Sequence, residues 1–411
     1  MKVVFCTYDF ANYYNGPNSW MRRLLPQLRS RGVEIRVLFI KTSEAGPTFD
    51  DLTRLGFDCP HFDWHTKTQD KITWILKQVA LWPPDVFFAN LVVPAYYAGR
   101  WIREAGIPTV GILHTDDPFY RGIVAEFVRG DPLYRVSAMI CVSKWQKKNL
   151  ESMHLENTII YRIPYGTPIP SDTASMPRDR LRLVYTGRFV ETQKRVSDLT
   201  RALCRAVREV PGTEAVMYGD GEARSDLIRI IKEECATRVH LAGIVDAARI
   251  QDALLGCHAF VLLSDFEGLP ISLLEAMACG VVPICLKIRS GVPELIEHGV
   301  TGLLVDDRGD DFVRAVHRLR TDPGLWARLS RSARAMVVRD YASTTVADDW
   351  VDVFNTLAEG GRRTCLNPVP HTFELPAVHP ELACEDFRNA ADIAGPRFSS
   401  EDFLAAGARM R

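Results

Sequence analysis

The 411-residue sequence has almost no net charge, because 50 basic side chains face 51 acidic ones and the formal balance is -1. Without an excess of lysine and arginine, no global field is available to attract nucleic acid. No apolar run reaches the length of a membrane span, and the one in MKVVFCTYDF is too short for a signal peptide. These absences predict a cytoplasmic protein without a nucleic-acid partner.

Several cofactor and metal motifs are also missing. The ten cysteines contain no C-x-x-C pair and no regular spacing. Most lie in apolar runs, as Cys6, Cys141 and Cys285 do, so reduced thiols packed as small hydrophobic groups are favoured over a disulfide or zinc framework. No G-x-G-x-x-G follows the first predicted strand, which argues against a dehydrogenase.

What the sequence does contain is one alternating pattern. Short β-branched or aromatic runs are separated by amphipathic helical stretches, which is typical of parallel sheets covered on both faces. The predicted strands are 2–8, 34–41, 85–90, 108–114, 138–143 and 158–166, then 182–187, 215–219, 239–245, 259–264, 281–287 and 302–306.

The stretch PYGTPIPSDTASMPRDR, at 164–180, carries four prolines and no helical or strand period, so it indicates a linker. The fold class that follows is α/β, with two tandem Rossmann-like, doubly wound parallel-sheet domains facing across a cleft. The predicted parts are an N-terminal domain at 1–167, a linker at 168–180, a C-terminal domain at 181–340, a terminal helix at 341–360, and a tail at 361–411 to which the sequence gives no role.

Ligands of open parallel sheets bind beyond the carboxyl ends of the strands. Polar residues follow several predicted strands at that edge. They are Arg188 and Lys194 after 182–187, Asp220 beside Gly219 after 215–219, Glu267 after 259–264, His114 at the end of 108–114, and Gly16 in the loop after 2–8. We therefore expect a cleft with a cationic pair on one wall.

The segment SDFEGLPISLLEAMACG, at 264–280, places a carboxylate in an apolar helix. We predict a helix with Pro270 in its first turn and its end at Gly280. Glu275 then lies among apolar or small neighbours, which is costly unless it accepts hydrogen bonds. A sugar or ribose diol offers two donors at that spacing. Glu267 lies just before the helix, whose N-terminus favours a phosphate.

These motifs carry a family resemblance. The E-x7-E of EGLPISLLEAMACG resembles the signature of the family 4 retaining glycosyltransferases, which have the GT-B fold. YTGRFVETQK, MYGDGEARSDL, VHLAGIV and SGVPELIEHGVTGLLVDD resemble further family segments in the same order. The similarity covers essentially 1–358 and is strongest over 180–310.

The resemblance implies a role for each matching residue. Arg188 and Lys194 neutralise the diphosphate of a nucleotide-sugar donor, Glu275 holds the ribose hydroxyls, Glu267 holds the transferred sugar, and His114 approaches that sugar from the first domain. The implied donor-binding set is Gly16, Arg188, Lys194, Gly219, Asp220, Glu267, Gly268, Leu269 and Glu275, with the N–H groups of Gly268 and Leu269 on the diphosphate.

The same resemblance bears on cofactors and on the acceptor. Glycosyltransferases of the other common fold use a metal on a D-x-D motif, and this sequence contains none. The cationic pair substitutes for it, so we expect no metal and no cofactor.

The loop after the first strand departs from the family, because Pro17 follows Gly16 where many members have a second glycine. A glycan, a lipid-linked glycan and a small molecule all remain open as acceptor.

A structural role is the alternative for each of these residues. Arg188 and Lys194 would be surface charges or partners of Glu191. His114 would be a core histidine, and Glu275 an exposed helix residue. In the same way Asp220 would make a local turn, and Asp116 and Asp117 would cap a helix, the interpretation we favour for this pair.

The function and the location of the protein keep alternatives too. A non-catalytic nucleotide-sugar binding or assembly protein, an epimerase and a phosphorylase share the architecture. Retention is compatible with Glu267 as a nucleophile or with same-face attack. The basic stretches SWMRRLLPQLRSRG and SKWQKKNL raise the hypothesis of peripheral contact with the inner membrane face, although a solvated helix face is favoured.

Overall fold

The computed structural model describes residues 1–11, 15–155, 157–246, 249–360, 366, 369–370 and 372–382. Contacts divide the chain into two compact units. Unit 1 comprises Met1–Val142, Gln146–Ile163 and the described part of Ala347–Arg411, and unit 2 comprises Ser143–Trp145 and Pro164–Val346. The main division along the chain therefore falls beside the proline-rich stretch.

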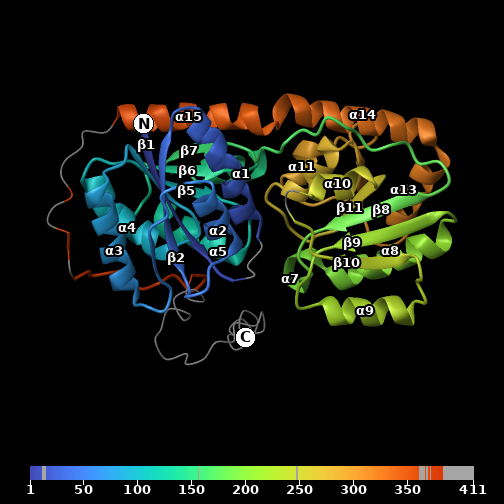
Figure 1. Ribbon diagram of the computed structural model, residues 1–411, viewed down its shortest axis with the longest axis horizontal. Helices are drawn as coiled ribbons and strands as arrows, with labels where there is room; N and C mark the ends of the chain where they lie inside the picture. Colours follow the sequence, from blue (N-terminus) through green and yellow to red (C-terminus); the bar gives the residue numbers. More distant parts are fainter. Residues whose placement is uncertain are drawn as a thin grey trace. The chain divides into compact units, whose positions relative to one another are not determined.

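Unit 1 is built on a seven-stranded parallel sheet in the order β3-β2-β1-β4-β5-β6-β7 (Figure 1). Its central strands are apolar on both faces, because helices cover both sides. The strands are β1 Lys2–Asp9, β2 Glu34–Lys41, β3 His61–Asp63, β4 Val86–Ala89, β5 Thr109–Leu113, β6 Ala138–Cys141 and β7 Ile159–Arg162. The helices are α1 Gly16–Ser30, α2 Pro47–Arg54, α3 Thr68–Leu81, α4 Val93–Glu104, α5 Pro118–Val124, the π-helix η1 Ala125–Arg129, α6 Lys144–Glu151 and α15 Ser343–Glu359.

Unit 2 holds a six-stranded parallel sheet in the order β10-β9-β8-β11-β12-β13 (Figure 1). Its strands are β8 Leu181–Thr186, β9 Thr213–Tyr218, β10 Val239–Gly243, β11 Ala259–Leu262, β12 Val282–Leu286 and β13 Leu303–Val305. Its helices are α7 Glu191–Lys194, α8 Val196–Glu209, α9 Arg224–Glu233, α10 Ile250–Leu255, α11 Ile271–Ala278, α12 Val292–Leu295, α13 Asp310–Thr321 and α14 Pro323–Asp340.

The prediction of two α/β units, each with a parallel sheet, is confirmed. All twelve predicted strands are present, and one further strand of unit 1, β3, was missed because its residues His-Phe-Asp do not form an apolar run. The predicted strand at 158–166 is shorter than expected and ends at Arg162. The predicted terminal helix is α15, and its carboxyl-terminal part packs with unit 1.

Strand order fixes where a ligand site is expected in each unit. The order reverses between β1 and β4 in unit 1, and between β8 and β11 in unit 2. Such switch points leave a crevice at the carboxyl ends of the strands. The loops after β1, β4 and β5 and those after β8 and β11 are therefore where we expect ligand-binding residues.

Two further sequence expectations can be compared with the described residues. Every cysteine in this part of the chain is a free thiol, and six are buried, as expected for reduced thiols in the core. No helix among these residues is long and apolar enough to cross a membrane.

Candidate active site

Helix α11 carries the buried carboxylate. The prediction placed Pro270 in its first turn, which is wrong by one position: Pro270 is the N-cap with extended backbone, and the helix begins at Ile271. The helix ends at Ala278, and Gly280 follows with a left-handed φ of 75°. Glu275 is only 6% exposed, so the alternative of an exposed helix residue is wrong. A carboxylate held in such surroundings needs hydrogen-bond donors.

Glu267 lies in the loop between β11 and α11, and side chains from α7 hold both of its oxygens. Lys194 Nζ lies 2.5 Å from Glu267 Oε1, and Gln193 Nε2 donates to Oε2 at 3.3 Å. Gln193 also bonds this loop through two backbone groups, the carbonyl of Phe266 and the N–H of Asp265. The α7 turn and the loop after β11 are therefore locked together at the switch point.

Buried groups surround this pair. The hydroxyls of Tyr165 and Tyr185 and the thiol of Cys285 have raised pKa values, first because of burial and second because of the nearby charge of Glu267. All three therefore stay protonated at neutral pH. The Tyr185 hydroxyl donates to the carbonyl of Arg188 at 2.9 Å and so fixes the backbone after β8.

Arg188 differs from Lys194 in its surroundings. Its side chain is exposed, and within the described residues its guanidinium makes no hydrogen bond or ion pair. The alternative in which Glu191 pairs with Arg188 or Lys194 is wrong, because Glu191 instead accepts from the N–H of Ser197 at 3.0 Å. The planar guanidinium thus presents its donors to solvent at the strand ends, where a phosphate could take them.

The turns after β8 and β9 are packed too closely for side chains. A Cβ built on Gly219, whose φ is 145°, would lie 1.9 Å from the carbonyl oxygen of Gly187. Asp220 beside it is exposed; its Oδ1 accepts from the N–H of Gly221 at 2.8 Å and lies 3.8 Å from Arg224 Nη1. The contacts of Asp220 are therefore those of a local turn.

The loop before α11 packs against a second loop that the sequence analysis did not select. Gly268 and Leu269 are buried, and the carbonyl of Gly268 accepts from the N–H of Gly291 at 2.7 Å. A Cβ on Gly291 would lie 2.2 Å from that oxygen. The segment SGVPELIE was recognised as family-like, but its glycine was not identified as the residue that allows this approach.

In unit 1, His114 follows β5 and is buried, with 5% exposure. Its Nε2 lies 2.7 Å from Asn90 Oδ1, and the rings of Trp20 and Tyr120 stand edge-on to it at 5.4 and 5.8 Å. Burial lowers the pKa of the imidazole to about 3, so the ring is neutral at physiological pH. Since the amide oxygen only accepts, Nε2 carries the proton. The burial fits the core-histidine alternative, and a role toward the sugar stays a prediction.

The loop after β1 offers few free donors for an anion. Gly16 is the first residue of α1, Pro17 has no N–H, and the N–H of Asn18 bonds the Asn15 side chain at 2.7 Å. Of the first three positions of α1, only Gly16 retains an N–H that no described contact occupies. The predicted weakness of this phosphate cradle follows from both Pro17 and the Asn15 cap.

Residues 14–169 match the family described as Glycosyltransferase Family 4, and residues 180–322 match the family described as Glycosyl transferases group 1. Together the two matches span more than half of the chain. The chain belongs to glycosyltransferase family 4.

Two curated relatives illustrate the range of this family. One, N-acetyl-alpha-D-glucosaminyl L-malate synthase of Bacillus anthracis, is 30% identical over 42% of this chain and 44% of its own length. Another, alpha-D-kanosaminyltransferase of Streptomyces kanamyceticus, is 29% identical over 44% of this chain and 46% of its own length. The match thus spans less than half the length of either relative.

Solved structures show the fold. HepE of Anabaena, solved in complex with UDP and glucose, is 18% identical, covers 87% of this chain and all of its own, and has a TM-score of 0.71. Sucrose-phosphate synthase of Thermosynechococcus elongatus is 16% identical over 88% of this chain and all of its own, with a TM-score of 0.68. The two units of this family 4 chain are therefore those of the GT-B fold.

Sequence reasoning missed Asp9, at the carboxyl end of β1. Its Oδ2 accepts from the N–H groups of Thr48 and Phe49 at 2.8 and 2.7 Å and so caps α2. Burial raises the pKa of this carboxyl to about 6, despite the two backbone N–H bonds and the charge of Arg22. No local signal marks it, because its partners lie about forty residues away.

The prediction that Asp117 caps a helix is confirmed, since its Oδ1 accepts from the N–H of Tyr120.

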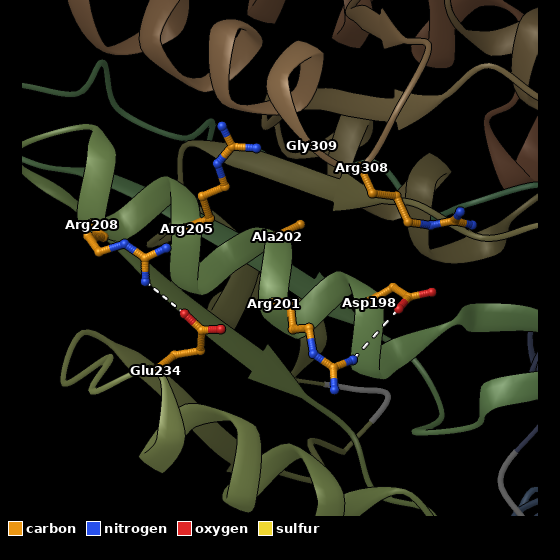
Figure 2. Close-up of a pocket in the computed structure, with 8 residues that line it drawn as sticks. All are labelled: Asp198, Arg201, Ala202, Arg205, Arg208, Glu234, Arg308 and Gly309. Carbon is orange, nitrogen blue, oxygen red and sulfur yellow. Dashed lines mark hydrogen bonds and ion pairs between the residues drawn. The ribbon is translucent and has the colours of Figure 1, made fainter.

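A hollow of about 370 Å³ in unit 2 lies along α8 (Figure 2). Four arginines line it, and each is matched by carboxylates. The pairs are Arg201 with Asp198, Arg205 with Glu209 and Asp310, Arg208 with Glu234, and Arg308 with Asp265. Because each of the four arginines already has a carboxylate partner, we interpret the hollow as a surface ion-pair network and not as an anion site.

Helix α1 contains the basic stretch considered for membrane contact. Trp20 is 3% exposed and packs in the core. Arg22 pairs with Asp51 at 2.7 Å, Arg29 stands over the ring of Phe57, and Arg31 pairs with Asp348. These three arginines thus interact within unit 1. Peripheral membrane contact stays a prediction.

Proposed function

We propose that the protein is an enzyme that transfers a hexosyl group from a nucleoside-diphosphate sugar to an acceptor hydroxyl, with retention of anomeric configuration and without a metal. One observation carries the proposal. The switch point of unit 2 combines the Lys194–Glu267 pair with the exposed guanidinium of Arg188 and with α11, which carries the buried carboxylate of Glu275.

The chemistry of transfer explains these residue types. When the bond between the anomeric carbon and the phosphate oxygen breaks, its electron pair leaves with the diphosphate, so negative charge grows there. Arg188 and Lys194 supply positive charge and hydrogen-bond donors where that charge develops. Glu275 accepts from the ribose hydroxyls, because hydrogen-bond donors stabilise a buried carboxylate.

The state of Glu267 favours same-face attack over a covalent intermediate. Both of its oxygens already accept hydrogen bonds, from Lys194 and Gln193, which lowers their nucleophilicity. In same-face attack the acceptor oxygen bonds to the anomeric carbon on the side that the phosphate leaves. The acceptor proton passes to the departing phosphate, so that no enzyme carboxylate has to form a bond. Glu267 then orients the transferred sugar.

The comparisons support a nucleotide-sugar donor. HepE was solved with UDP and also with UDP-glucose, and the Streptomyces kanamyceticus relative is named for glycosyl transfer. We propose uridine nucleotides as the first donors to examine, with a glycan, a lipid-linked glycan or a small molecule as acceptor. The cytoplasmic location expected from the sequence is part of this proposal.

A thermal-shift screen tests the proposal directly. UDP, GDP, ADP and their common sugar conjugates would be added to the wild type, to Glu275→Ala, and to Glu233→Ala as an exposed control on α9 of the same unit. A ligand that binds only the folded protein raises its melting temperature. We expect one nucleotide series to shift the wild type and the control but to act weakly on Glu275→Ala. No shift with any nucleotide would contradict the proposal.

The products then separate the enzyme classes. Release of nucleoside diphosphate that depends on an acceptor supports a transferase. Conversion of the donor sugar without an acceptor would support an epimerase. Binding without any turnover across a panel of acceptors would favour a binding or assembly protein.

A further inference from the structure

Described residues 372–382, here called the strap, lie against unit 1 without forming a helix or strand. Their placement therefore depends on contacts made by individual groups. The ring of Phe373 stands edge-on to that of Trp101 at 4.8 Å, and its carbonyl accepts from Gln69 at 3.4 Å. The Tyr134 hydroxyl donates to the carbonyl of Glu374 at 2.8 Å. The strap is thus fixed to α3, α4 and the segment after η1.

The last contact of the strap is with α5. Leu382 is fully buried, and a Cβ built on Gly122 would lie 2.8 Å from Leu382 Cγ. The neighbouring residues form an ion pair, with Arg121 Nε 3.3 Å from Glu381 Oε1. The space that a side chain at position 122 would need is therefore filled by Leu382, which acts as a plug on this helix.

Helix α5 also touches the candidate active site. Tyr120, on the same helix, stands edge-on to the His114 ring at 5.8 Å. Two residues along an α-helix are separated by about 200° of rotation, so Tyr120 and Gly122 point to opposite sides. The helix therefore lies between the histidine at the end of β5 and the Leu382 plug.

This helix has little stability of its own. It has only seven residues and passes directly into the π-helix η1. Helices this short are marginal in isolation, and π-helical turns are rare and concentrate near functional sites. The position of α5, and of Tyr120 with it, is consequently set by what packs on its two sides.

We propose that Leu382 is a positioning residue for His114, acting through Gly122 and Tyr120 of α5. The proposal rests on the proposed function in placing His114 at the site of transfer. It assigns a structural purpose to part of the carboxyl-terminal tail, because the strap holds the wall of the first domain in the geometry that the acceptor side requires.

The test compares two buried leucines of unit 1. Leu382→Ala removes the plug, whereas Leu52→Ala makes the same truncation on a different helix, α2, and Leu52 is equally buried. The first readout is the His114 imidazole signal in protein labelled at histidine, assigned with His114→Gln. The second is kcat and KM for transfer, and the third is UDP affinity by calorimetry.

We expect Leu382→Ala to let water reach His114, so that its imidazole begins to titrate above pH 5, where the wild-type signal should stay flat because burial lowers the pKa of His114 to about 3. We expect kcat to fall on the order of tenfold with UDP affinity unchanged, because a small displacement of an active-site wall acts on catalysis. Leu382→Met should restore both, and Leu52→Ala should change neither. A flat His114 signal in Leu382→Ala would overturn the proposal.

A second pair of variants covers the case in which Leu382→Ala does not fold. Gly122→Ala should disturb His114, because its Cβ meets Leu382, and Leu382→Val should relieve this in the double variant. Simple additivity would overturn the proposal. The His114 signal decides the question even if no sugar transfer is found, so a failure of the proposed function is distinguishable from a failure of this inference.

Discussion

Lys194 Nζ lies 2.5 Å from Glu267 Oε1, and the two side chains are only 14% and 6% exposed. The lysine comes from the turn after β8 and the glutamate from the loop after β11, so the pair joins the two strands between which the sheet order reverses. A pair this buried is sensitive to the loss of one partner, because the remaining charge is left uncompensated.

Removal of the lysine alone should therefore affect both stability and catalysis. We expect Lys194→Met to lower the free energy of unfolding by about 3 kcal/mol, since the Glu267 carboxylate stays buried without its cation. Urea denaturation measures this. Lys194→Met/Glu267→Gln should recover most of the stability, because no buried charge remains, but should not recover transfer. Equal stability of the single and double variants would show that the pair is not coupled.

His114 should make stability depend on acid. Burial holds its pKa at about 3 in the folded protein, below the usual 6.5, so the unfolded chain binds more protons between these values. The contribution of the neutral His114 to the free energy of unfolding is fully present above pH 6.5. It is lost as the pH falls toward 3, by up to about 1.4 kcal/mol per pH unit. Denaturation midpoints measured from pH 7 to 4.5 should fall less steeply in His114→Gln than in the wild type. Parallel slopes would mean that the histidine is solvated in solution.

Asp9 should produce the opposite trend. Its folded pKa of about 6 is above the usual 3.8, so the folded protein binds more protons between these values. The associated stability is present below pH 3.8 and is lost as the pH rises through 6. The free energy of unfolding of Asp9→Asn relative to the wild type should therefore increase between pH 4 and 6.5 and then level off. If the difference in free energy of unfolding between Asp9→Asn and the wild type is constant with pH, the raised pKa of Asp9 is contradicted.

The sequence predicted what local pattern encodes. Glu275 was correctly placed as a buried helical carboxylate, because apolar neighbours at helical spacing enclose it whatever the rest of the fold does. The strands of both sheets followed from continuous apolar runs for the same reason. β3 was missed because its residues His-Phe-Asp form no apolar run, unlike the equally short β13, which reads Leu-Leu-Val.

Contacts made over long distances in sequence could not be predicted. The sequence around Asp9 does not indicate that Asp9 caps α2. Likewise, the sequence around Gly122 does not indicate that Leu382, about 260 residues later, occupies the space beside it. Ion pairing also depended on residues distant in sequence. Glu191 is three residues from both Arg188 and Lys194, yet Lys194 bonds Glu267 instead. Sequence proximity suggested the wrong partner because the fold brings the loop after β11 to α7.

Metal independence is the last prediction and follows from the charges at the switch point. In the proposed mechanism Arg188 and Lys194 provide the positive charge that a divalent cation would otherwise supply to the departing diphosphate. Among the described residues, no three His, Cys, Asp or Glu side chains are arranged to hold an ion. We expect EDTA to leave the transfer rate unchanged, and Mg²⁺ or Mn²⁺ added afterwards to have no effect.

In Arg188→Ala the rate should fall at least about tenfold, because a donor to the developing charge is lost. We expect that variant to stay insensitive to both additions as well. Loss of activity with EDTA that Mn²⁺ restores would show that the cationic pair is not sufficient, and a metal site would then have to be sought with the donor bound.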